Sequence, residues 1–182
     1  MQKPILSHIL GVIVLALTFI SSSFAQQPAP TPKEVQIKNI VLEPGVMQGS
    51  NRQWIKVVTQ FESTPRWADG ISFSYAVLLG AGDQFRVLPG IVRYANVKGG
   101  PNRAVMYISP NTAERFGPPL AVHVKAFYKD DQADEFALKP PANVNQQWEA
   151  KYNKYPGLLM TVLSTPWVFS DYSASPDIFA AQ

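Results

Sequence analysis

The clearest hydrophobic pattern in the chain is the alternation of apolar side chains with serine and alanine from Ile71 to Leu79. A repeat of two residues is typical of a strand that buries one face. The stretch from Gln53 to Glu62 alternates in a similar but less regular way. Between the two, Pro65 cannot donate to a strand ladder, and Asp69-Gly70 favours a tight reversal. The pattern therefore predicts a strand–loop–strand unit whose apolar face packs against a second sheet.

Shorter alternating stretches precede and follow this unit. The expected strands cover residues 34–42, 85–88, 91–97, 103–109, 120–128 and 135–139, with a bulge or a change of sheet near residue 39. The expected loops and turns cover residues 43–51, 80–83, 89–90, 99–102, 110–119 and 129–134, with one helical turn near 112–116. Many short strands with no long helical pattern between them favour an antiparallel sandwich, and about seven strands suit an immunoglobulin-like topology.

The pattern changes after Pro140-Pro141, where helical spacing replaces alternation. Asn143 is a suitable N-cap, and Pro156-Gly157 ends the pattern. The residues at helical spacing are Val144, Trp148, Tyr152 and Tyr155. A final strand and a tail rich in proline, serine and aromatic residues complete the chain. The expected fold is thus mainly β: an antiparallel immunoglobulin-like β-sandwich with a short C-terminal helix.

The N-terminal region, residues 1–25, has the features of a signal peptide. Lys3 supplies the positive charge, the apolar stretch runs from Ile5 to Ile20, and Ser23-Phe24-Ala25 places small residues at the cleavage site. The apolar stretch is shorter than the ~20 residues of a membrane span, and a retained anchor is the alternative. Residues 26–33 are expected to form a proline-rich spacer, and 34–182 the sandwich with its C-terminal extension. Export through the Sec pathway would place the protein in the periplasm, in the outer membrane or outside the cell.

Composition excludes several classes of site. The chain contains no cysteine, so disulfides, thiolate metal sites and lipid attachment at cysteine are impossible. The net charge of +3 comes without basic runs, which gives no reason to expect nucleic acid as a partner. Membrane contact is expected only through partners or through an uncleaved signal.

Catalytic groups are scarce. His123, between two valines, is the only histidine after the signal. A Ser-His-Asp site would have to use it, but no Gly-x-Ser-x-Gly elbow supplies the serine. We interpret His123 as a solvent-facing residue on the polar face of its strand. Glu62, Asp69 and Glu114 show no signature of a paired-carboxylate hydrolase. The sequence predicts no enzyme, no catalytic residue and no cofactor.

An acidic cluster in the last expected hairpin turn has two interpretations. It consists of Asp130, Asp131, Asp134 and Glu135. Oxygen ligands at these positions suit Ca²⁺, although the spacing does not match an EF-hand loop. A charged turn that keeps an edge strand soluble explains the cluster as well, and no metal ligand is assigned.

Arg66 and Trp67 are the candidate contacts with a partner. They lie side by side in the expected loop between the two central stretches. An exposed Trp67 would stack on a sugar or anchor a protein partner, whereas a buried one would cap the core. Both interpretations remain open at this point.

Several motifs together carry a resemblance to a known family. They are Val35-Gln-Ile-Lys-Asn-Ile, Trp54-Ile-Lys-Val, Asp69-Gly-Ile-Ser-Phe-Ser-Tyr, and Ser164-Thr-Pro-Trp167 with Asp171-Tyr172. Over most of the mature length the chain resembles small exported immunoglobulin-like proteins of the Verrucomicrobia, of the Akkermansia type, which are encoded beside type IV pilus-like assembly genes. The resemblance implies a non-enzymatic component of the cell envelope. Because a pilin leader is missing, it implies an accessory or exposed subunit.

The expected function is therefore that of an exported structural or interaction module, an accessory component of a pilus-like assembly. Its partners would be other envelope or pilus-like assembly proteins. The alternative is a carbohydrate-binding module that recognises extracellular glycans. A hydrolase built around His123 is a third hypothesis.

Overall fold

The structure is a computed structural model. It describes residues 33–46, 52–166 and 178–179, all of which belong to the unit Pro32–Gln182. The expected signal peptide, nearly all of the proline-rich spacer and the motif residues Trp167, Asp171 and Tyr172 lie outside the described residues. Within the described ranges, no helix is long and apolar enough to span a bilayer.

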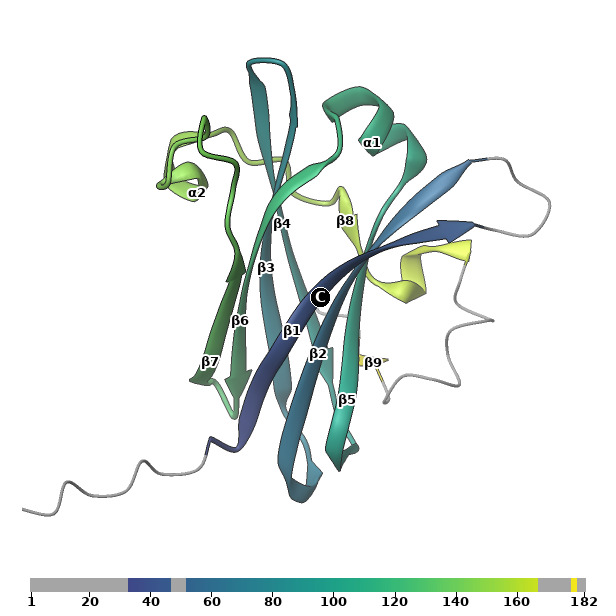
Figure 1. The fold of residues 1–182 in the computed structure, drawn as a ribbon. Helices are drawn as coiled ribbons and strands as arrows, with labels where there is room; N and C mark the ends of the chain where they lie inside the picture. Colours follow the sequence, from purple (N-terminus) through teal and green to yellow (C-terminus); the bar gives the residue numbers. More distant parts are fainter. Residues whose placement is uncertain (1–32, 47–51, 167–177, 180–182) are drawn as a thin grey trace, which may run out of the picture. The chain divides into compact units, whose positions relative to one another are not determined.

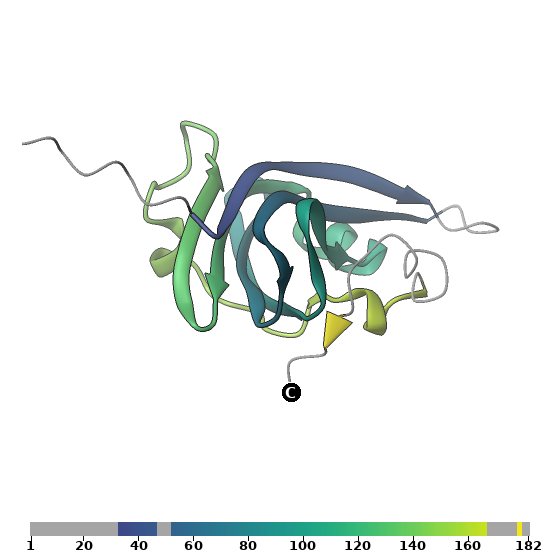
Figure 2. The same cartoon turned by 90° about the horizontal axis from the view of Figure 1, so that it is seen from below.

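Two antiparallel sheets form the unit (Figures 1 and 2). The first sheet contains, in spatial order, β1 (Val35–Val46), β2 (Gln53–Ala68), β5 (Val97–Ile108) and β8 (Leu159–Met160). The second sheet contains β7 (Asp131–Leu138), β6 (Pro119–Tyr128), β3 (Ile71–Ala81), β4 (Gln84–Tyr94) and β9 (Ile178–Phe179). The order β1-β2-β5 against β7-β6-β3-β4 corresponds to strands A-B-E against G-F-C-C′ of immunoglobulin domains. The predicted immunoglobulin-like sandwich is confirmed.

We expected the two central stretches of the sequence to form one hairpin. They belong instead to opposite sheets. Asp69-Gly70 carries the chain from β2 in the first sheet to β3 in the second, with Gly70 at a φ of +74°. Across the sandwich the rings of Phe61 and Phe73 lie 4.8 Å apart. The apolar face of each stretch therefore packs against the other stretch. The sequence suggested a hairpin because a crossing between sheets needs the same turn residues.

A buried hydrogen bond also joins these two strands. The hydroxyl of Tyr75 donates to that of Thr59 at 2.9 Å, in the interior between the sheets. Burial raises the pKa of Tyr75 well above its ordinary value, and the nearby Tyr94 adds to the effect. The phenol therefore stays neutral and remains a donor at every physiological pH.

Two of the expected turns are interior parts of long strands. Pro89-Gly90 lies within β4. The N–H of Val87 bonds to the carbonyl oxygen of Asn153 and so points away from β3, and the missing N–H of Pro89, two residues further on, belongs to the same side. On that side β9 pairs only with Arg93 and Tyr94, so no ladder between described strands is interrupted. A Cβ on Gly90 would come within 2.8 Å of the side chains of Leu159 and Met106. This glycine leaves room for these two side chains and does not mark a reversal.

The expected reversal at residues 99–102 is likewise wrong, because β5 runs through it. The turn before β5 falls instead at Asn96, which has a φ of +52°. The carboxylate of Asp69 accepts a hydrogen bond from the backbone N–H of Asn96 at 2.8 Å and holds the turn. The expected loop at 43–51 is shorter than predicted, since β1 extends to Val46. The predicted irregularity near residue 39 is confirmed as a register shift between Ile37 and Asn39.

The helices are short. α1 (Pro110–Phe116) confirms the expected helical turn, with the Ser109 side chain as its N-cap. The expected C-terminal helix is reduced to α2 (Trp148–Lys151), followed later by a 3₁₀ turn, η1 (Val162–Ser164). Asn143 is not the N-cap; Asn145 accepts a hydrogen bond from the N–H of Gln147 instead, and this local turn delays the start of the helix.

A second apolar cluster lies on the outer face of the second sheet. Residues 144–152, here called the α2 segment, place Val144 and Trp148 against Leu78, Val87 and Ala121 of the sheet. The helical spacing therefore identified the residues that cover the sheet, although most of them lie outside the helix. The main core lies between the two sheets, with Phe61, Phe73 and Tyr94 among its largest fully buried side chains.

Candidate functional site

Trp67 lies on the outer face of the first sheet, near the end of β2. Its neighbour Ala68 is fully buried and pairs with the fully buried Val97 of β5. Because successive strand residues point to opposite faces, Trp67 and its cross-strand partner Lys98 point away from the core. Trp67 is 58 % exposed. Of the two interpretations, the structure excludes the core cap and leaves the partner contact as a prediction.

The backbone around Trp67 is held closely between two strands. The register of β2 against β5 shifts between Ser63 and Trp67. At this bulge, a Cβ on Gly99 would come within 2.5 Å of the carbonyl oxygen of Pro65, so only glycine fits without a shift. The side-chain amide of Asn102 donates to the carbonyl oxygens of Lys98 and Gly100, each at 2.8 Å. Trp67 therefore extends from an ordered strand and not from the loop that we expected.

Two exposed cations accompany Trp67. Arg66 precedes it on β2, and Lys98 lies opposite it on β5. Within the part of the chain that the structure describes, neither cation has an acidic partner. By contrast, Lys38 pairs with Glu62 at 2.8 Å, and Arg103 pairs with Glu43 at 2.9 Å.

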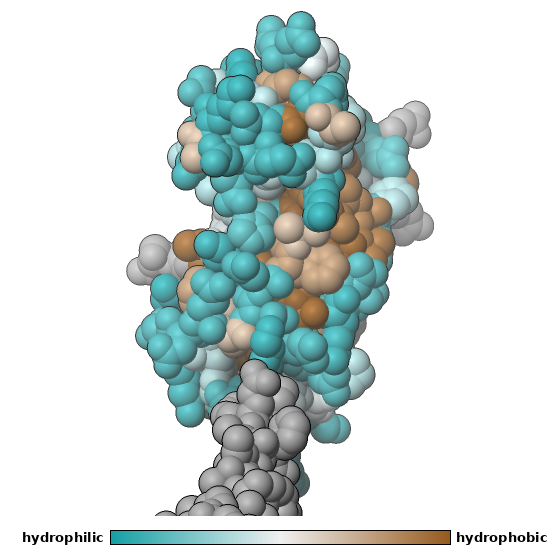
Figure 3. Space-filling view, turned by 60° about the vertical axis from the view of Figure 1, so that its left-hand side comes forward, coloured by the Kyte–Doolittle hydropathy of each residue, from teal (hydrophilic) through white to brown (hydrophobic). Residues whose placement is uncertain are grey.

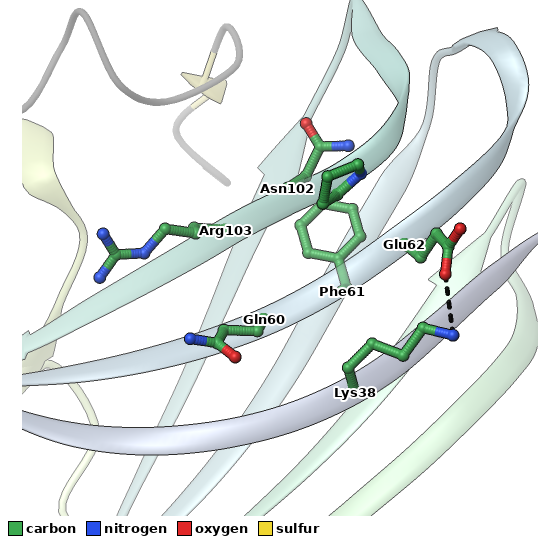
Figure 4. A pocket seen from close by; sticks show the side chains of 7 residues that line it. Lys38, Gln60, Phe61, Glu62, Asn102 and Arg103 are labelled. Carbon is green, nitrogen blue, oxygen red and sulfur yellow. Dashed lines mark ion pairs between the residues drawn. The ribbon is translucent and has the colours of Figure 1, made fainter.

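A groove of about 370 Å³ lies on the same face, along β1, β2 and β5 (Figure 4). Gln60 and Glu62 of β2 line it together with Pro101 and Arg103 of β5 and Lys38 of β1. Figure 4 shows Lys38 reaching from β1 to Glu62 on β2, while Arg103 extends away from that pair. The groove combines the hydrocarbon parts of its proline and long side chains with donors and acceptors. No sequence pattern predicted it.

The strands β1 and β7 are the edges of the two sheets on one side of the sandwich. Asp134 of β7 joins them: its carboxylate accepts hydrogen bonds from the Lys33 ammonium at 2.5 Å and from the Ile37 N–H at 2.8 Å. Burial by itself would raise the pKa of Asp134. The hydrogen bonds from Lys33 and from the N–H groups of Ile37 and Glu135 outweigh burial, and the pKa lies below its ordinary value.

Hydrophobic side chains reach the surface at this edge. Ala133, Phe136 and Leu138 of β7 are partly buried and pack against the main core. Figure 3, in which the left-hand side of Figure 1 comes forward, shows hydrophobic atoms gathered at mid-height with hydrophilic atoms around them. In Figures 1 and 2, β1 starts beside β7 and then diverges from it. Between described strands, β7 is paired only with β6.

His123 lies on the outer face of β6, as expected, but its side chain is only 19 % exposed, so the interpretation as a solvent-facing residue is wrong. Its Nδ1 lies 2.6 Å from Oε1 of Glu149 on α2, and its Nε2 lies 3.9 Å from Oε2 of Glu135 on β7. A catalytic triad needs a serine hydroxyl at the second nitrogen. Ser74 lines the same pocket of about 110 Å³, but no hydrogen bond joins it to the imidazole in the described part. The contacts of His123 fasten the α2 segment to the sheet.

The acidic cluster does not converge. The turn between β6 and β7 contains only Lys129 and Asp130, with φ values of +51° and +69°. Asp131, Asp134 and Glu135 therefore belong to the strand, where successive side chains point to opposite faces. Among the described residues, no three histidine, aspartate or glutamate side chains lie close enough to hold a metal ion.

Comparison with known proteins supports the fold. No family model and no curated protein matches the sequence. Among solved structures, a crystal structure of a protein from Akkermansia muciniphila matches with a TM-score of 0.66 at 16 % sequence identity, over 81 % of this chain and 94 % of that one. At this identity the match shows a shared fold. The resemblance found in the sequence is thus supported as far as an Akkermansia protein with the same sandwich, and it extends over most of both chains.

Proposed function

We propose that the protein is an exported, non-enzymatic interaction module that acts as an accessory component of a pilus-like assembly of the cell envelope. One observation carries the proposal: the edge strand β7 is paired on one side only among the described strands and brings half-buried Phe136 and Leu138 to the surface. The sequence resemblance and the predicted signal peptide support the location. The arrangement around His123 supports a role without catalysis, because both ring nitrogens face carboxylates.

The proposed mode of contact is addition of a partner strand to β7. An added strand gains main-chain hydrogen bonds from the edge and specificity from alternate side chains. Asp134 and the start of β1 occupy the beginning of β7. Because β1 then diverges, the residues from Glu135 to Leu138 form the part of the edge that a partner reaches (Figure 1).

The test is affinity purification of the tagged protein from envelope fractions after crosslinking. The expected result is co-purification with pilus-like assembly proteins. Leu138→Lys places a charge on the half-buried edge and should abolish co-purification, whereas Ile91→Lys, which changes a 50 % exposed residue of β4, should not. Ile91→Lys should keep the wild-type unfolding midpoint, and Leu138→Lys, at a residue that packs against the core, is compared at a temperature at which both variants are folded. Recovery of the wild-type protein as a solitary monomer in periplasmic extracts would contradict the proposal.

The exposure of Trp67 favours a second candidate function, recognition of extracellular glycans. A glycan array probed with the purified protein tests it directly. An array without any signal would remove this candidate and leave the edge-strand proposal untouched.

A further inference from the structure

We propose that the outer face of β2 and β5 around Trp67 binds an acidic saccharide chain. The indole ring would stack on a sugar ring, and Lys98, on the same face, would pair with a carboxylate or sulfate group of the chain. This inference rests on the second candidate function, glycan recognition, and specifies the class of glycan and the residues that hold it.

The ring is presented in a form suited to stacking. A flat platform binds best when little side-chain and backbone freedom is lost on binding. Trp67 lies within the β2–β5 ladder, opposite Lys98, next to a bulge that Gly99 and the Asn102 amide hold in place. With 58 % of the residue exposed, a face or an edge of the indole is accessible to a ligand. The C–H groups of a sugar ring carry small positive charges and are attracted to the negative face of an aromatic ring.

The surroundings of Trp67 favour a saccharide over a protein. Hot spots of protein interfaces lie among other contacts that exclude water. On the described parts of β2 and β5, Trp67 is the only large apolar residue that is exposed. The other large apolar residues that are exposed in the described part of the chain lie on β1, β4 and η1 and are Leu42, Val46, Ile91 and Leu163. A single aromatic ring in polar surroundings matches a ligand that is itself polar apart from its C–H faces.

Charge determines the class of saccharide. Lys98 lies opposite Trp67 on the same face and, within the described residues, has no acidic partner, whereas the cations Lys38 and Arg103 of this sheet pair with Glu62 and Glu43. The ammonium group of a lysine attracts a carboxylate or a sulfate as a point charge. Free positive charge is thus concentrated at the ring, where an acidic sugar would place its anionic group.

The groove extends the site along the strands. Pro101 follows Lys98 by three residues, about 10 Å at the rise of a β-strand. The groove offers the amide of Gln60, the Lys38–Glu62 pair and the guanidinium of Arg103, which together supply donors and acceptors for hydroxyl groups. A ligand of several sugar units would therefore contact Trp67 at one end and the groove at the other.

The experiment is isothermal titration calorimetry of the purified protein with heparin oligosaccharides, oligogalacturonate and neutral dextran, at about 0.15 M salt, where unspecific attraction is screened. The expected result is saturable binding of both acidic ligands and none of dextran. Trp67→Ala should weaken binding by about tenfold or more, and Lys98→Glu should weaken it as well. Ile91→Ala and Lys139→Glu, an apolar and a cationic change at exposed sites outside β2 and β5, should leave it unchanged.

Several outcomes would overturn the inference. The first is that neither acidic ligand binds, and the second is that Trp67→Ala binds them as tightly as the wild-type protein does. The third is that polyglutamate binds as tightly as the acidic saccharides and depends equally on Trp67, which would identify an acidic peptide as the ligand. Binding of dextran alone, with dependence on Trp67, would refute the acidic class and leave glycan recognition standing. Since Trp67 is exposed, its alanine variant should keep the wild-type unfolding midpoint, and this measurement separates loss of contact from loss of fold.

Discussion

The contact between β1 and β7 makes a quantitative prediction about stability. Asp134 is a nearly buried carboxylate, with its side chain 9 % exposed, and it accepts hydrogen bonds from Lys33 and from the N–H of Ile37. Lys33 is 54 % exposed, so its ion pair should contribute only about 0.2–1 kcal/mol. The hydrogen bond from the buried backbone group to a charged acceptor should contribute more, about 1.5–3 kcal/mol.

Three substitutions should therefore follow a fixed order in the free energy of unfolding at neutral pH. Lys33→Ala should cost up to about 1 kcal/mol. Asp134→Asn keeps an acceptor for Ile37 but loses the charge, and should cost about 1–2 kcal/mol. Asp134→Ala leaves the N–H of Ile37 without a partner and should cost about 2–3 kcal/mol. Asp131→Asn, an exposed carboxylate on the same strand, is the matched control and should change stability by less than about 0.5 kcal/mol.

The effect should also depend on pH. The pKa of Asp134 in the folded protein lies below the ordinary value of 3.8, so the folded state holds its proton less tightly than the unfolded state does. The resulting stabilisation is complete well above 3.8 and is lost as the pH falls through the folded pKa. Urea unfolding at neutral pH and at a series of acidic pH values measures this. The reasoning is refuted if Asp134→Asn and Asp131→Asn are equally stable at neutral pH, or if the deficit of Asp134→Asn persists undiminished at the acidic end.

Three further predictions concern the interior and the covering segment. Thr59→Val and Tyr75→Phe should each lower the free energy of unfolding by about 1–3 kcal/mol, because each leaves the other residue's buried hydroxyl unpaired. The double variant should lose less than the sum of the two, which urea unfolding of the wild-type protein and the three variants measures. Gly99→Ala should cost about 1–3 kcal/mol in the same assay, since its Cβ would meet the neighbouring strand, and an unchanged midpoint would contradict the close approach. Glu149→Gln removes the charge beside His123 and should speed amide hydrogen exchange in α2 but not in β3; equal rates would show that the pair does not fasten the segment.

The fold class was predictable because alternation and turn chemistry are local properties of the chain. The stretch from Ile71 to Leu79 alternates as far as Val77 and forms β3 within one residue or two of the expected limits. The same signals do not say which strand is the neighbour of which. Asp69-Gly70 suits a hairpin and a crossing between sheets alike, and packing of Phe61 on Phe73 across the sandwich decides for the crossing. Pro89 and Gly90 inside β4 were misleading for a related reason, since the space around Gly90 is limited by side chains that are distant in the sequence.

The contacts at the surface were less predictable, because they join residues that are far apart in the sequence. Nothing local to Asp134 indicates that it holds β1, and the cluster to which it seemed to belong is divided by the strand geometry. His123 was expected to face solvent because its strand pattern placed it on the polar face. His123 does lie on that face, but the α2 segment covers it, and the carboxylate of Glu149 replaces water as the hydrogen-bond partner of the imidazole.

The orientation of Trp67 follows from a single change of phase in β2. Thr59, Phe61 and Ser63 are buried at every second position, and uninterrupted alternation would place residue 67 in the core as well. The register shift after Ser63 reverses the phase, so Ala68 is buried and Trp67 is exposed. Deleting Thr64 and Pro65 together removes the two residues by which β2 exceeds β5 between Ser63 and Trp67, and it should place Trp67 at an inward position of the uninterrupted alternation. The iodide quenching of Trp67 fluorescence, measured as the difference from the same protein carrying Trp67→Phe, should then fall below that of the intact chain. If the quenching of Trp67 stays as it is in the intact chain, the bulge is not what directs this residue to the surface.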